Sequence, residues 1–151
     1  MRDPWLAFVV CSLLVACDRG VEIEPSTAVV YSRDIQPLFN QRCATAGCHD
    51  ATTAKENLVL DSWVSVFRGS DHGAMVVPFR LEKSHLIFHV NTDSTIAPTA
   101  QPLMPPGQPL SREEIQLLMR WVGERARNDN GEIAFAQTSS GKVFVCGQGE
   151  D

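Results

Sequence analysis

The chain has 151 residues, of which 44 % are hydrophobic and 21 % are charged. This length allows one ordinary domain, and the composition excludes a disordered or fibrous protein. The formal net charge of -5, without any run of basic residues, argues against a surface for nucleic acid or anionic lipid, since both require clustered Lys and Arg. The chain contains 5 cysteines, an odd number that cannot all pair within one molecule.

The N-terminal segment, residues 1–16, has the features of a secretory signal peptide. Its apolar part is shorter than the roughly 20 residues that a membrane-spanning helix needs. The sequence Leu14-Val15-Ala16-Cys17 that ends it resembles the lipobox of bacterial lipoproteins, in which the cysteine is lipidated and becomes the first residue after cleavage. We therefore expect residues 1–16 to be removed together with Cys11, and Cys17 to carry lipid. The alternative is an ordinary signal peptide followed by a coincidental cysteine.

A short tether and a first helix are expected next. Residues 17–30 have no periodicity and contain Gly, Pro, Ser and Thr, which is typical of a linker. The folded domain is expected to begin near Tyr31. Asp34 is suited to cap a helix that leads to Cys43, with Pro37 in its first turn. The apolar face of this helix would consist of Ile35, Leu38 and Phe39.

Two short helices are expected in the middle of the chain. The first follows an inward-facing segment at residues 58–60 and runs through Phe67, with Asp61 or Ser62 as its N-cap. The second spans residues 82–90 and would bury Leu86, Ile87 and Val90. Residues 91–110 carry several prolines and are expected to form a long irregular loop, which in a compact domain usually has a function.

The clearest helix signal lies near the C-terminus. Ser111 and Glu114 have the spacing of a capping box, and the helix is expected to run to about Arg127. Its apolar positions recur at helical spacing: Ile115, Leu118, Met119 and Val122. The last segments, residues 132–137 and 142–146, alternate in hydrophobicity and predict a small β-hairpin.

Residues 43–49, CATAGCH, carry the most specific chemistry in the chain. Two thiols followed directly by an imidazole are what covalent haem attachment requires: Cys43 and Cys48 to bond the vinyl groups, and His49 to bind the iron. The usual motif has two residues between the cysteines, whereas here there are four small ones that could bulge outward. A disulfide between Cys43 and Cys48, half of a zinc site, or chance remain as alternatives.

A second iron ligand is expected from the proline-rich loop. Met104 lies in the sequence LMPPG, where proline restricts the backbone so that the sulfur is presented with little reorganisation. Met75 is the reserve candidate, and Met119 belongs to the apolar face of the last helix. His85 and His89 face the same side of a helix, so either could replace Met104, although flanking the pocket or facing solvent is the plainer interpretation. An open sixth position that binds a small ligand is a further alternative.

Residues 31–127 resemble the planctomycete-type cytochrome c domain. The resemblance lies in an Asp-x-x-Pro helix before the cysteines, Leu-x-Leu-Asp-Ser at residues 58–62, Val-Pro followed by a Ser-x-Leu-Ile helix, and an MPP loop followed by a Ser-x-Glu-Glu-Ile helix that ends in Trp. It implies an all-α, cytochrome c-like domain around one covalently bound haem c, to which residues 128–151 add the hairpin tail. In such domains the first and last helices cross, and we expect Phe39 and Trp121 to meet there.

The resemblance also implies a function. The protein would be a membrane-anchored, monohaem electron carrier and not an enzyme, with Cys43 and Cys48 as anchors and His49 and Met104 as axial ligands. It would lie in the bacterial cell envelope, facing the periplasm or the exterior, and would bind redox partner proteins but no nucleic acid. Two alternatives stay open: a non-redox lipoprotein binding module with a Cys43–Cys48 disulfide, and a zinc module that adds His85 or His89 to the CATAGCH residues.

Overall fold

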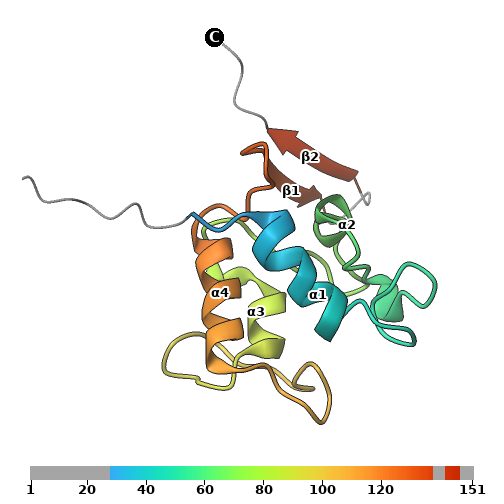
Figure 1. Cartoon of the computed structure of the whole chain (residues 1–151), viewed down its shortest axis with the longest axis vertical. Coiled ribbons are helices and arrows are strands. Elements are labelled where there is room, and N and C mark those ends of the chain that lie inside the picture. Colours follow the sequence, from blue (N-terminus) through green and yellow to red (C-terminus); the bar gives the residue numbers. More distant parts are fainter. Residues whose placement is uncertain (1–27, 138–141, 147–151) are drawn as a thin grey trace, which may run out of the picture.

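A computed structural model describes residues 28–137 and 142–146 of the chain (Figure 1). The predicted signal peptide, Cys17 and most of the predicted tether lie outside these residues. The described part consists of four short α-helices joined by long loops, with a two-stranded antiparallel sheet at one end. No helix among the described residues is long and apolar enough to cross a membrane.

The first helix begins earlier than the sequence predicts. A π-helical turn at Tyr31–Ile35 leads directly into α1, Gln36–Arg42. Asp34 therefore does not cap α1; its carboxylate accepts a hydrogen bond at 2.8 Å from the backbone N–H of Val30, the residue just before the π-helical turn. Pro37 lies in the first turn of α1 as predicted, where no backbone donor is lost.

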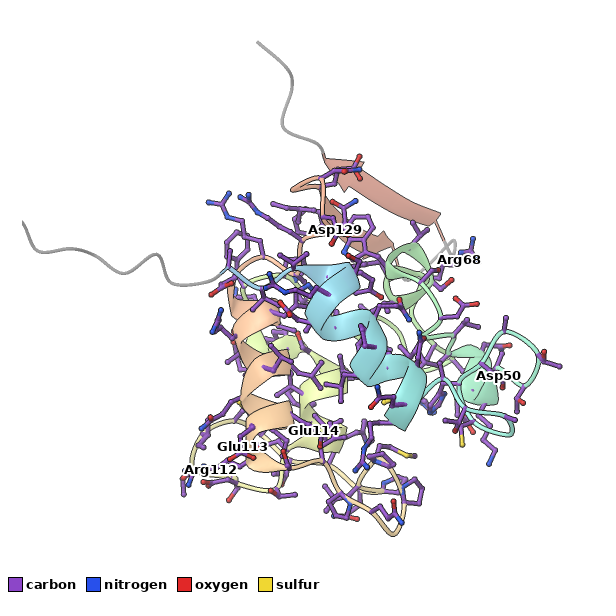
Figure 2. All side chains as sticks on the ribbon, viewed as in Figure 1. Asp50, Arg68, Arg112, Glu113, Glu114 and Asp129 are labelled. Carbon is purple, nitrogen blue, oxygen red and sulfur yellow. The ribbon has the colours of Figure 1, made fainter. Side chains whose placement is uncertain are left out.

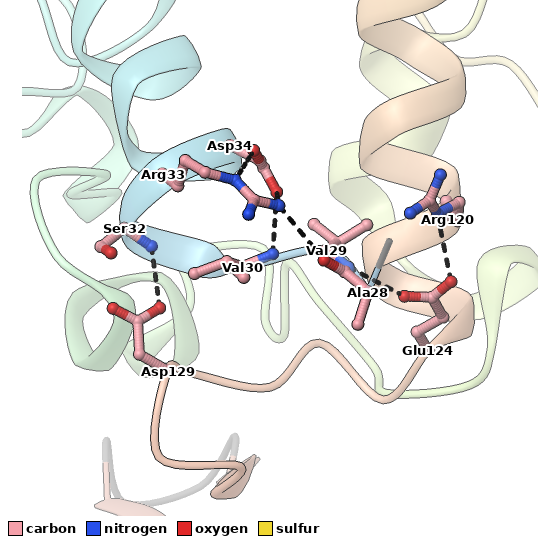
Figure 3. Close-up of polar contacts among 9 residues, drawn as sticks. All are labelled: Ala28, Val29, Val30, Ser32, Arg33, Asp34, Arg120, Glu124 and Asp129. Carbon is pink, nitrogen blue, oxygen red and sulfur yellow. Dashed lines mark hydrogen bonds and ion pairs between the residues drawn. The ribbon is translucent and has the colours of Figure 1, made fainter. Parts of the chain in front are cut away.

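The N-terminal end of this segment is held by the other end of the domain. The backbone N–H of Ser32 donates to Asp129 Oδ1 at 2.9 Å, and that of Val29 donates to Glu124 Oε2 at 3.4 Å (Figure 3). Val29 also packs against the core. The last residues of the predicted tether are thus part of the folded domain.

The helix α2, Trp63–Arg68, has Ser62 as its N-cap, as predicted; the Ser62 hydroxyl accepts from the Ser65 N–H at 3.4 Å. Before it, Leu58 and Leu60 are buried while Asp61 is exposed. The predicted helix over residues 82–90 is divided at Ser84. A 3₁₀ turn at Leu81–Lys83 precedes it and α3, His85–Val90, follows it.

The interruption at Ser84 has a local cause. Its backbone is extended, and its buried hydroxyl donates to the carbonyl of Arg80 at 2.8 Å and accepts from the N–H of Val77 at 3.0 Å. The Ser84 hydroxyl thus bonds to the backbone of the preceding loop, and the helix does not continue through this residue. The predicted buried side of α3 is confirmed for Leu86, Ile87 and Val90.

The helix α4, Arg112–Gly123, begins with the predicted capping box of Ser111 and Glu114. It ends four residues before the predicted Arg127, because Arg125 and Ala126 adopt positive φ angles of 84° and 51°. The N–H of Ala126 then donates to the carbonyl of Trp121 at 2.8 Å, which closes the helix end. All four predicted apolar positions are buried: Ile115, Leu118, Met119 and Val122.

The strands β1, Ile133–Gln137, and β2, Lys142–Cys146, pair antiparallel with Ile133 opposite Cys146. They lie where the sequence predicts a hairpin, and β1 packs against α2. The connecting residues 138–141 lie outside the described part. The core is a cluster of aromatic and aliphatic side chains from the π-helical turn and from α1 to α4, with Trp121 at its centre among Tyr31, Phe39 and Phe67.

Candidate functional site

A cavity of about 490 Å³ lies beside this core. Most of the side chains singled out from the sequence line it, although they come from distant parts of the chain. They are Cys43, Cys48 and His49 from the CATAGCH segment, Met75, His85 and His89 from the middle, and Met104 from the proline-rich loop. Leucine, valine and proline side chains form much of the remaining wall: Leu58, Leu60, Leu86, Val90, Pro102, Pro105 and Pro106.

The CATAGCH segment forms a closed turn at the end of α1. The N–H of Cys43 donates to the carbonyl of Phe39 at 2.8 Å, and the N–H of His49 donates back to the carbonyl of Cys43 at 3.1 Å. Between them Gly47 adopts a φ of +84°, and a Cβ placed there would have no atom within 4 Å. Ala46 and Gly47 are exposed, whereas Ala44 packs against the core, so the second half of the insertion faces outward.

The thiols of Cys43 and Cys48 are both free and are not joined in a disulfide. Cys43 is buried, and this burial raises the pKa of its thiol to about 12, despite the opposing effect of the Arg42 charge. Cys48 is only half-buried. At neutral pH the Cys43 thiol is thus protonated inside the wall of the cavity.

The backbone of His49 is held on both sides. Its N–H is bonded to Cys43, and its carbonyl accepts from the N–H of Leu60 at 2.9 Å. The ring lines the cavity, and its Nδ1 atom is buried without a hydrogen-bond partner. An imidazole whose ring is not engaged by neighbouring side chains is free to act as a ligand to a group in the cavity.

The loop that carries Met104 is attached to α3. The N–H of Met104 donates to the carbonyl of His89 at 2.7 Å, and the N–H of Ala100 donates to the carbonyl of Phe88 at 2.8 Å. The ring Nδ1 of His89 lies 2.9 Å from the carbonyl of Pro102. These bonds bring Met104 into the wall of the cavity that also holds His49.

The other methionines differ from Met104 in their surroundings. Met75 lines the cavity and is buried, with 7 % of its surface exposed. Its sulfur accepts a hydrogen bond from the Ser70 hydroxyl at 3.4 Å. Met119 is buried on the apolar face of α4 and does not line the cavity. Met104 is therefore the cavity methionine without a hydrogen bond to its sulfur in the described part of the chain.

The histidines of the middle region flank the cavity. His85 and His89 both line it, and the exposed His72 does so with its Nε2 atom 3.2 Å from Glu56 Oε2. Within residues 28–137 and 142–146, no group of three or more His, Cys, Asp or Glu side chains is arranged to hold a metal ion. The zinc alternative would require such a group.

Sequence reasoning missed Arg42. Its Nη2 atom donates to the carbonyls of Gln108 and Pro109, both at 3.1 Å, and its Nε atom lies 3.7 Å from Glu114 Oε1. Arg42 lines the cavity. The only feature of the sequence that could have drawn attention to Arg42 is its position directly before Cys43. The spacing of residues does not reveal a side chain that bonds to the backbone of a distant loop.

The cavity suits a haem group. Its volume lies within the roughly 300–1,000 Å³ that is usual for cofactor sites, and its walls are largely apolar. Two thiols and an imidazole lie on one segment, and a thioether lies on another, which is the donor set of a covalently bound haem with a His/Met ligand pair.

The comparison with known families agrees with this chemistry. Residues 46–108 match the family described as Planctomycete cytochrome C. The resemblance found in the sequence is confirmed for this segment, which includes Cys48, His49 and Met104 and begins just after Cys43. No match was found among curated proteins or solved structures.

Proposed function

We propose, from the cytochrome C match at residues 46–108, that this protein is a monohaem c-type cytochrome that carries single electrons in the bacterial cell envelope. The observation that carries the proposal is the shared cavity, which brings Cys43, Cys48 and His49 together with Met104. Two segments far apart in sequence line one space and would supply complementary ligands to it.

Each residue has a distinct role in this proposal. The thiols of Cys43 and Cys48 would become thioethers to the haem, and His49 and Met104 would bind its iron. When bound, the haem supplies one-electron oxidation and reduction. As a soft thioether ligand, Met104 would favour the reduced iron and so raise the potential of the site.

The protein matrix would serve the transfer by limiting reorganisation. Leu58, Leu60, Leu86 and Val90 would present an apolar wall to the haem, and backbone hydrogen bonds fix both ligand segments. The chain would make and break no bond in a substrate, so it would act as a carrier and not as an enzyme.

The N-terminal sequence supports a proposed cellular placement. Lipidation of Cys17 after removal of residues 1–16 would hold the domain at a membrane surface, and more than one acyl chain makes such anchoring stable. Redox partner proteins of the envelope would then be met at the same surface. The net charge of -5 favours partners with a basic face.

Haem staining tests the proposal. The full chain is expressed with the haem-attachment machinery, boiled in denaturant and run on a gel that is stained for haem. A stained band is expected for the unmodified chain, a weaker one for Cys43→Ser or Cys48→Ser, and none for the double variant. Absence of the band in the unmodified chain contradicts the proposal, and staining of the double variant contradicts the assigned anchors.

A further inference from the structure

We propose that Arg42 is a positioning residue for the loop that carries Met104, and that it fixes the sulfur relative to the CATAGCH segment. This inference rests on the proposed function, because it assigns Arg42 a part in holding the sixth ligand. Arg42 is the last residue of α1 and directly precedes Cys43. It therefore connects the two segments that supply the cavity with ligands.

The first step is the hydrogen bonding of the guanidinium. Its Nη2 atom carries two N–H groups, and two carbonyls, those of Gln108 and Pro109, lie 3.1 Å from it. Both carbonyls belong to the end of the Met104 loop, just before α4. Arginine stays charged at all ordinary pH values, so these charge-assisted bonds persist.

The second step is the link to the capping box of α4. Glu114 Oε2 accepts from the Ser111 N–H at 2.6 Å, while Glu114 Oε1 lies 3.7 Å from Arg42 Nε. Figure 2 shows Glu114 with Arg112 and Glu113 at the N-terminal end of α4. The two oxygens of one carboxylate thus serve the helix start and the arginine.

The relative strength of the Arg42 contacts with Glu114 and with the loop carbonyls can be judged from distance and burial. The side chains of Arg42 and Glu114 retain 27 % and 30 % of their accessible surface, but the Arg42 Nε atom is buried and makes no hydrogen bond, since its 3.7 Å distance to Glu114 is too long for one. The hydrogen bonds to the carbonyls of Gln108 and Pro109 are the stronger part. We therefore expect loss of Arg42 to affect the loop more than loss of the Glu114 charge.

The third step is that the loop is held from two sides. On one side, α3 holds residues 100–104 through the carbonyls of Phe88 and His89. On the other side, Arg42 holds Gln108 and Pro109. Met104 lies between these attachments, so release of one side would let its sulfur move away from the place where it would bind the iron.

The test uses the haem-loaded full chain and four variants. Arg42→Ala removes the hydrogen bonds, Arg42→Lys keeps a donor and the charge, and Glu114→Gln removes the ion pair but keeps a side chain suited to the capping box. Arg112→Ala is the matched control, because it removes an exposed arginine charge from the same end of α4. The readouts are the sulfur-to-iron absorption band, the reduction potential and hydrogen exchange of residues 101–110.

We expect Arg42→Ala to weaken the band, lower the potential and speed exchange of the Met104 amide by about tenfold, which is the size that lost hydrogen bonds predict. Arg42→Lys should recover part of each change, and Glu114→Gln should show a smaller change. Arg112→Ala should resemble the unmodified chain. If Arg42→Ala keeps the band and the exchange rate, or if Arg112→Ala changes them equally, the inference is wrong.

Failure of the proposed function is recognised separately. A full chain that takes up no haem would contradict the function, whereas hydrogen exchange of residues 101–110 still reports whether Arg42 holds the loop. If Arg42→Ala does not fold, Arg42→Lys and Glu114→Gln decide the question: an undiminished band and unchanged exchange in both would overturn the inference.

Discussion

Phe39 of α1 and Trp121 of α4 meet edge to face, with their ring centroids 6.1 Å apart and their planes at 80°. Phe39 is fully buried and Trp121 is 1 % exposed. This contact joins the first and last helices of the domain, as the sequence predicts. It lies in the core that supports the cavity, so its loss should weaken the domain as a whole.

Replacement of Phe39 by Ala is expected to lower the free energy of unfolding by about 3–5 kcal/mol, because it leaves a large void in the core. Phe79→Ala is the matched control, since Phe79 is 50 % exposed. Its ring lies 5.2 Å from the Arg125 guanidinium, measured to the ring centroid. This substitution should cost roughly 1 kcal/mol or less. Denaturant unfolding of both variants measures the difference, and equal losses would contradict the assignment of Phe39 to the core.

Met104→Ala is expected to abolish the sulfur-to-iron absorption band of the haem-loaded protein while covalent haem remains. Met75→Ala should keep the band, because the Met75 sulfur is already bonded to the Ser70 hydroxyl. Met119→Leu is a control for a buried methionine outside the cavity. Loss of the band in Met75→Ala alone would identify Met75 as the ligand, and absence of the band in the unmodified protein would direct attention to His85 and His89.

Cys43 is expected to react with iodoacetamide much more slowly than Cys48 in the folded, haem-free, reduced protein at pH 8. The thiolate is the reactive form, and burial raises the pKa of the Cys43 thiol to about 12. Mass spectrometry of the peptides that contain each cysteine measures the two rates. The difference should vanish in denaturant; equal rates in the folded protein would show that Cys43 is accessible.

Asp129→Asn is expected to reduce stability at pH 7 and to have a smaller effect in acid. Hydrogen bonding by Ser32, first through its hydroxyl and then through its backbone N–H, lowers the pKa of Asp129 below its ordinary value. A lowered pKa in the folded state adds stability above the unfolded value of about 4, and this stability is lost as the pH falls through the folded value. The contribution is modest because the group is exposed.

Unfolding of Asp129→Asn and the unmodified chain between pH 7 and pH 2 checks this expectation. The two stability curves should converge as the pH falls below about 4. Asp61→Asn removes another exposed carboxylate and serves as the control. A constant difference between the curves across the whole range would show that the hydrogen bonding to Asp129 does not depend on its charge.

The elements of the domain could be predicted wherever side chains act on their own backbone. Ser62 and Ser111 mark helix starts through local hydrogen bonds, and the apolar face of α4 follows from its periodicity. The errors occur where a local turn or side-chain hydrogen bond interrupts a helix that the apolar periodicity predicts to continue. The hydroxyl of Ser84 interrupts a predicted helix, and the turn at Arg125 and Ala126 ends α4 early.

The candidate site was likewise predictable in part. Cys43, Cys48, His49 and Met104 were identified from residue type and order, and the structure brings all four to one cavity. Arg42 could not be found in this way. Its partners, Gln108 and Pro109, are joined to it through their backbone carbonyls, which every residue possesses and which leave no trace in the sequence.

The closed turn of residues 43–49 holds His49 beside Cys43 although the segment between the two cysteines is longer than usual. Because the His49 N–H bonds directly to the Cys43 carbonyl, the backbone of the first cysteine and that of the histidine stay together although four residues separate the two cysteines. A search that fixes two residues between the cysteines would pass over this chain. A search for a backbone turn that closes on the first cysteine and ends in histidine would find it.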